Sequence, residues 1–132
     1  MENNIADREK DKFVDVGGQP AVAVANPDGS TIAGGLSTPS GIGHGVKTVT
    51  TAGTDVVLAS TTPCVSVTIQ AQTDNTGVIA VGGSGVDATI ATGTGNVLEA
   101  GESISMDISN LNLIYIDSTV SGDGVRYTYL TA

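Results

Sequence analysis

Apolar and polar residues alternate with a period of two along several short runs in the second half of the chain. This period is typical of a strand that buries one face and wets the other. The apolar positions in these runs are Val65, Val67, Ile69, Ile104, Met106 and Ile108. We expect them to lie in a core or a subunit interface, together with Ile114 and Ile116 from the most apolar run.

Strand-like runs recur at close spacing from Val46 onward, with Gly, Asn or Asp between them. The predicted strands are residues 46–51, 55–59, 63–70, 78–81, 86–90, 102–108, 111–116 and 125–130. The run 111–116 is continuously apolar and predicts a central strand, Ser121–Gly124 predicts a hairpin turn, and residues 93–101 hold at most one helical turn. The fold class predicted is all-β, an antiparallel, jelly-roll-like β-sandwich of about eight short strands.

The first part of the chain has a different composition. Charge is dense up to Asp15, a short alternating run follows at residues 20–24, and Asn26–Gly29 is a turn signal. Residues 34–45 are rich in Gly, Ser and Thr, as flexible linkers are. We therefore divide the chain into an extended N-terminal arm and linker, residues 1–44, and a sandwich body, residues 45–132. The arm buries too little apolar surface to fold alone, so we expect its order to come from a partner.

Composition agrees with the strand pattern. Aromatic residues make up only 3% of the chain, there is no Trp, and there are 18 Gly. A core built from Val, Ile, Leu and Ala, with many turn residues and few strong helix formers, favours a pleated sheet over helices.

Charge is distributed unevenly. The net charge is −9, and the five basic residues are Arg8, Lys10, Lys12, Lys47 and Arg126. A body with two basic residues cannot displace the counterions of a nucleic acid or bind an acidic membrane, so we expect neither partner. No apolar run approaches the roughly 20 residues that span a bilayer, and the charged start differs from a secretory signal. We expect the protein to be made and folded in a cytoplasm.

Few residues could carry chemistry. His44 lies between two glycines in the expected linker, where nothing holds an imidazole against a nucleophile, and there is no second histidine for a metal site. The lone Cys64 excludes an intramolecular disulfide and is expected to be a small buried residue. The glycine clusters 82–85 and 93–95 lack the helix and lysine of a phosphate loop. No catalytic residue, cofactor site or metal site is predicted, and the chain is not expected to be an enzyme.

The chain has 14 Asp and Glu residues, which invites a search for paired catalytic acids. Those weighed as paired catalytic acids are Asp74, Asp87, Glu99, Asp107, Asp117 and Asp123. Most stand beside Gly, Ser or Thr at strand ends or on outward positions, so solvation and protection of strand edges are the expected roles. A calcium site from Asp117 and Asp123 stays open as an alternative without a recognisable loop spacing. The tyrosines Tyr115, Tyr127 and Tyr129 are expected to pack in the core or against another subunit rather than to bind a sugar.

Two parts of the sequence resemble known phage proteins. Residues 6–14 (ADREKDKFV) with 22–29 (VAVANPDG) resemble the opening of small virion proteins of tailed bacteriophages. Residues 47–54, 64–69, 97–104 and 114–117 are similar to a β-sandwich module of phage head-decoration and fibre-like proteins. The resemblance covers most of the chain and implies a partner role, because such proteins commonly trimerise and bind an assembled capsid lattice through an arm.

The sequence therefore predicts a capsid decoration, or cement, protein located in the virion. Its expected partners are the major capsid protein or other virion proteins, and further copies of itself in a homotrimer. The arm residues expected to bind the shell are Arg8, Lys10, Lys12, Phe13 and Val14. A tail, neck or head-fibre component is the nearest alternative, and a carbohydrate-binding surface module is the second.

Overall fold

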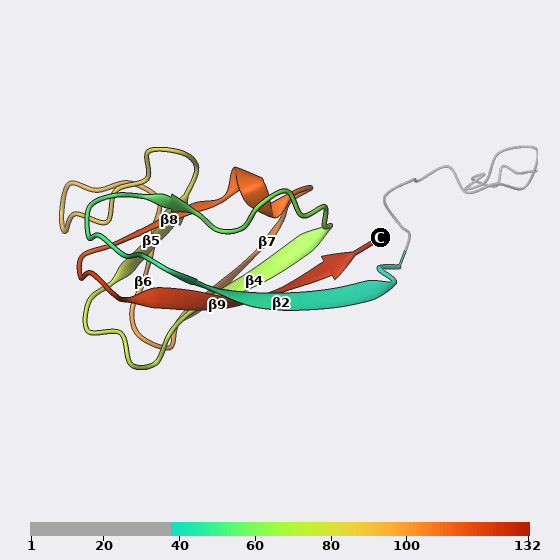
Figure 1. The fold of residues 1–132 in the computed structure, drawn as a ribbon, viewed down its shortest axis with the longest axis horizontal. Helices are drawn as coiled ribbons and strands as arrows, with labels where there is room; N and C mark the ends of the chain where they lie inside the picture. The colour runs from blue at the N-terminus through green and yellow to red at the C-terminus, as the bar shows by residue number, and fades with distance from the viewer. Residues whose placement is uncertain (1–37) are drawn as a thin grey trace, which may run out of the picture. The chain divides into compact units, whose positions relative to one another are not determined.

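Eight strands form two four-stranded sheets in residues 38–132, the part of the chain that this computed structural model describes (Figure 1). In chain order they are β2 (Gly41–Thr48), β3 (Val56–Val57), β4 (Ser66–Ala71), β5 (Ile79–Gly82), β6 (Asn96–Leu98), β7 (Ser103–Asp107), β8 (Tyr115–Ser118) and β9 (Gly124–Thr131). A 3-10 turn, η2 (Leu111–Leu113), precedes β8. The arm residues Arg8 to Val14 lie outside the described residues.

All strand pairs are antiparallel. The first sheet has the order β2-β9-β4-β7 and the second has the order β3-β8-β5-β6. The first and last strands of the body are therefore neighbours, and successive strands alternate between the two sheets, except for the hairpin β5–β6, as in a jelly roll. The all-β sandwich expected from the alternating pattern is confirmed.

The main core lies between the two sheets. Its fully buried aliphatic members come from the inner faces of both sheets and from the segments beside them: Val49, Leu58, Val67, Ile69, Ile79, Leu111, Ile116 and Val125. Ile104, Met106 and Ile108 are half-buried against this core, and Ile114 is buried. Val65 is the exception among the expected core positions, since it precedes β4 and is 37% exposed.

A second, smaller cluster covers the outer face of the second sheet. Ala80 of β5 packs there with Val86 and Ala88 from the connection between β5 and β6, and Tyr115 lies against them. The predicted strand 86–90 is wrong, because this segment bonds locally, with Thr94 N donating to the Asp87 carbonyl (2.8 Å), instead of joining a sheet. Its alternation reflects packing against the sheet, and Ile90 at its end is 65% exposed.

Three further expectations about local structure are wrong. The segment taken as at most a helical turn holds the strand β6, whose Leu98 is buried. The apolar run 111–116 is not one strand, because the Asn110 side chain accepts from Asn112 N (3.1 Å) and caps η2 before β8 begins. The turn Ser121–Gly124 is no hairpin, since it joins β8 of one sheet to β9 of the other.

The body begins earlier than expected. β2 starts at Gly41, so residues 41–44 belong to the first sheet rather than to a linker. At this end of the sheet Ser40 N donates to the Thr131 carbonyl (2.8 Å), which places the start of the sandwich beside its carboxyl end. His44 is exposed, as expected, but it is a strand residue held opposite Thr128 of β9.

Candidate assembly surface: the open face and edges of the first sheet

Three of the four inner-face positions of the edge strand β2 are glycines, and the fourth is Lys47. Gly43 and Gly45 stand opposite Tyr129 and Tyr127 of β9. A Cβ atom at Gly43 would overlap the ring of Tyr129, and one at Gly45 would overlap the ring of Tyr127. The two tyrosines thus lie across β2 and supply the packing that its own residues lack, so these positions require glycine.

The tyrosine rings also border the main core. Tyr127 and Tyr129 are half-buried against it, with ring centroids 6.3 Å apart and planes inclined by 31°. Burial raises the pKa of Tyr127, and its neighbour Tyr129 raises it further. Of the described tyrosines, Tyr115 packs instead against the small cluster on the second sheet. None of the three forms an aromatic platform on the outer face of the first sheet.

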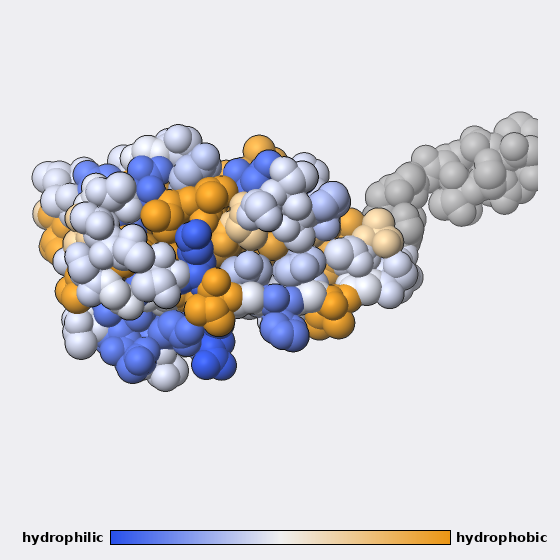
Figure 2. Space-filling model, in the orientation of Figure 1, coloured by the Kyte–Doolittle hydropathy of each residue, from blue (hydrophilic) through white to orange (hydrophobic). Residues whose placement is uncertain are grey.

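The outer face of the first sheet is open to solvent. Strand register places its side chains in rows that cross all four strands: Ile42, Leu130, Ser66 and Asp107 in one row, His44, Thr128, Thr68 and Ser105 in the next, and Val46, Arg126, Gln70 and Ser103 in the third. The hydroxyls of Thr68 and Ser105 are hydrogen-bonded at 2.7 Å. The apolar residues Ile42 and Val46 on β2 are 72% and 63% exposed, and Figure 2 shows apolar and hydrophilic groups side by side on one face of the molecule.

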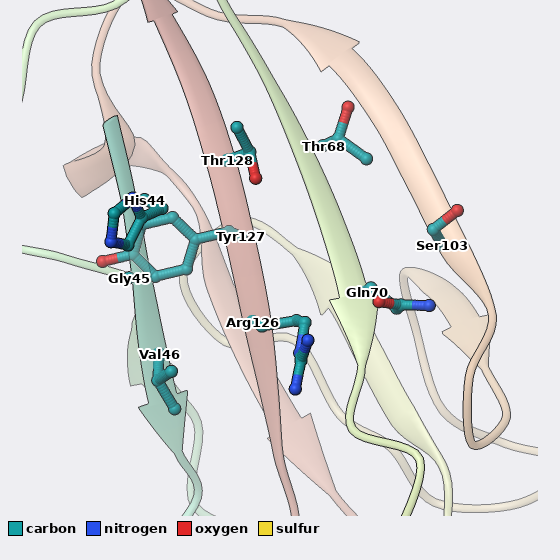
Figure 3. A pocket seen from close by; sticks show the side chains of 9 residues that line it. All are labelled: His44, Gly45, Val46, Thr68, Gln70, Ser103, Arg126, Tyr127 and Thr128. Atoms are coloured by element: carbon teal, nitrogen blue, oxygen red, sulfur yellow. The ribbon is translucent and has the colours of Figure 1, made fainter. Parts of the chain in front are cut away.

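A shallow groove of about 430 Å³ runs over this face. Figure 3 shows that its lining comes from all four strands, with hydroxyls of Thr128, Thr68 and Ser103 on β9, β4 and β7. The Arg126 guanidinium borders the groove, and its Nε donates to the Gln72 side chain (3.2 Å). The groove therefore offers hydroxyl, amide and guanidinium groups beside the apolar surface of Val46 and Tyr127.

Charge differs between the two edges of this sheet. The two basic residues of the described part lie on the β2 side of this sheet, Lys47 on the edge strand β2 and Arg126 on its neighbour β9. His44 is also on β2. The opposite edge strand, β7, carries Asp107 and follows directly on Glu102. One edge of the first sheet is therefore basic and the other acidic, although the body as a whole is acidic.

The carboxylates of Asp117 and Asp123 hold the backbone together. Asp117 is 1% exposed and accepts from Gly53 N (3.0 Å) and Ala88 N (2.9 Å), which ties two loops to β8. Asp123 is 7% exposed and accepts from Gly77 N (2.7 Å) and Thr76 N. The expectation that these two side chains are solvated is wrong. In residues 38–132 no group of three or more potential metal ligands comes together.

Cys64 and Asp87 have ordinary surroundings. Cys64 is buried, its thiol donates to the Ile108 carbonyl (3.2 Å), and burial raises its pKa. Hydrogen bonds from the hydroxyl and the backbone N–H of Thr89 lower the pKa of Asp87. No helix among the described residues is long and apolar enough to cross a membrane.

Comparison of the chain with protein-family models, with curated proteins and with solved structures finds no match.

Proposed function

We propose that this chain is a non-enzymatic structural protein of a tailed-bacteriophage virion. In this proposal it decorates, or cements, the assembled head, with the N-terminal arm binding the shell and the sandwich forming a homotrimer. The support from the sequence is its resemblance to small phage virion proteins. The structure adds one observation that carries the proposal, which is the open outer face of the first sheet together with its edge strands β2 and β7, each paired on one side within residues 38–132.

The second sheet lacks such a surface. Its outer face is covered by the connection between β5 and β6, and its edge strands β3 and β6 contain two and three residues. By contrast, β2 has eight residues, hydrogen-bonds to one neighbouring strand in the described part of the chain, and exposes Ile42 and Val46. Long edges and exposed apolar residues are costly in a soluble monomer and useful in an assembly.

The arm joins the body at the start of β2. Its basic residues Arg8, Lys10 and Lys12 surround Phe13 and Val14, and the body that follows is acidic. An aromatic anchor flanked by positive charge suits a groove on a larger particle. Each arm binds weakly by itself, but an oligomer presents several arms, and avidity raises overall binding by about 10² to 10⁴.

Removal of the arm tests this mechanism. The truncated protein should begin at Thr38, because the whole of β2 and of the core lies after this residue, whereas a start at Gly45 would remove half of β2. We expect residues 38–132 to fold and self-associate but to lose binding to virions assembled without the protein. Full-length chain with Phe13→Ala should bind more weakly than the wild type. Equal binding of the wild type and the truncated protein would contradict the role of the arm.

The groove on the first sheet favours a carbohydrate-binding module as a second candidate, since hydroxyl and amide groups line it. Glycan-array binding that Arg126→Ala abolishes, in a protein that fails to bind virions, would favour this alternative over the structural role.

A further inference from the structure

We infer that β2 of one copy pairs with β7 of a second copy, so that the first sheets of neighbouring subunits form one continuous antiparallel sheet. This inference rests on the proposed self-association and names the surface responsible for it. β2 and β7 are the two edges of the same sheet, and they are the longest edge strands of the described residues.

Strand direction allows this pairing. Each strand of the first sheet is antiparallel to its neighbour in the order β2-β9-β4-β7, so β7 runs opposite to β2. When a second copy is placed beside the first in the same orientation, its β7 meets β2 as an antiparallel partner. The contact joins two different edges and is thus head-to-tail, the kind that closes into a ring when the rotation per subunit permits.

Charge selects this arrangement over the symmetric ones. Lys47 shares the inner face of β2 with Gly43 and Gly45, and an inward charge on an edge strand normally blocks a further strand. Pairing β2 with a second β2 would bring Lys47 and Arg126 of one copy toward Lys47 and Arg126 of the other, so that like charges face each other. Pairing β7 with β7 would do the same for Glu102 and Asp107. Only the β2–β7 contact brings the basic edge to the acidic one.

One register satisfies both faces of the joined sheet. With residues 42–46 of β2 opposite residues 103–107 of β7, Lys47 stands opposite Glu102. On the inner face, Ile104 and Met106 then oppose Gly45 and Gly43, where no β2 side chain competes for space. Ile104 and Met106 are half-buried in a single copy, so this register completes their burial beside the tyrosines. On the outer face, His44 stands opposite Ser105.

A disulfide between strand partners tests the contact. The variant His44→Cys/Ser105→Cys should form intermolecular disulfides on mild oxidation, because paired Cα atoms about 4.5 to 5.5 Å apart lie within the span of a disulfide. Both positions are exposed, so folding is retained and is checked by circular dichroism. A non-reducing gel should show a ladder or ring of cross-linked subunits.

Matched variants give the contrary outcomes. His44→Cys/Thr68→Cys keeps both cysteines on the same outer face, but Thr68 lies on the central strand β4 and should not cross-link. The His44→Cys single variant should run as a monomer on the gel. The wild-type chain is the control for any cross-linking through the buried Cys64. Efficient cross-linking of His44→Cys alone would show a β2–β2 contact and overturn the inference. So would an oligomeric double variant without cross-links, or a wild type that sediments as a monomer at 100-fold the concentration used for virion binding.

The outcome is separable from that of the proposed function. Loss of cross-linking in a protein that still binds virions refutes the β2–β7 contact alone. Cross-linking in a protein that never binds virions refutes the decoration role and leaves the contact intact.

Discussion

Replacement of Asp117 by Ala or Asn tests whether the buried carboxylates are structural. This side chain is 1% exposed and accepts hydrogen bonds from the backbone of two separate loops. In Asp117→Ala, the buried N–H of Ala88 loses its partner. Gly53 N keeps a second one, the Ser118 carbonyl at 3.2 Å. The two bonds are therefore unequal, and most of the loss comes from Ala88.

The expected cost follows from this difference. A hydrogen bond to a charged group contributes about 1.5 to 3 kcal/mol, and an unsatisfied buried donor costs about 1 to 3 kcal/mol. Counting the Ala88 bond in full and the Gly53 bond in small part gives a loss of about 2 to 4 kcal/mol. For a body of this size that loss lowers Tm by roughly 10 to 25 °C. Asp117→Asn keeps the shape and can keep a carbonyl oxygen toward Ala88 N, with the amide NH₂ on the Gly53 side, so it should cost less than Asp117→Ala.

Chemical denaturation of the wild type and of both variants measures this cost. Asp74→Ala is the matched control, because Asp74 is exposed and should change the free energy of unfolding by less than about 0.5 kcal/mol. Unchanged or increased stability of both Asp117 variants would refute the structural role and would point to a carboxylate retained for another purpose.

Three other predictions concern packing and titration. Ile69→Ala removes a fully buried side chain and should cost about 3 to 5 kcal/mol, whereas the half-buried Ile104 should cost less; equal melting temperatures for the two variants and the wild type would contradict the assigned core. Gly45→Ala places a methyl group against Tyr127 and should lower stability by about 1 to 3 kcal/mol, which thermal unfolding will measure. The pKa values of Tyr127 and Cys64 are raised in the folded state above their ordinary values of 10.0 and 9.0. The free energy of unfolding should therefore be highest below about pH 9 and fall as the pH rises further. A denaturation midpoint that is constant from about pH 8 to 11 would contradict this.

Regular alternation allowed the sequence to predict much of the fold. In β4 and β7 the period of two is carried by the strand's own side chains, so Val67, Ile69 and Ile104 were assigned to the inner face correctly. Sequence reasoning missed the first half of β2, because the inward positions 41, 43 and 45 are glycines and the packing there comes from tyrosines more than eighty residues later in the chain. A repeated Gly-x-Gly-x-Gly pattern over residues 41–45, with Ile42 and His44 between the glycines and Val46 directly after them, is the signal that distinguishes this strand from a linker.

Tertiary contacts account for the other errors. The hydrogen-bond partners of Asp117 lie 64 and 29 residues away, and no local pattern around Asp117 indicates them. The charge difference between the edges of the first sheet was likewise hidden, because it depends on which strands form the edges. Strand order decides that Lys47 and Glu102 stand at opposite sides of one sheet, and strand order does not follow from the strand positions alone.

The position of the protein in an intact particle tests the central claim most directly. Electron cryo-microscopy of virions assembled with and without the chain should show difference density that fits the sandwich, arranged as symmetric oligomers on the outside of the head, with a connection from the start of β2 to the shell. Difference density at the tail, neck or fibres would assign the chain to another virion structure. Identical maps for the two kinds of particle would contradict the proposed role.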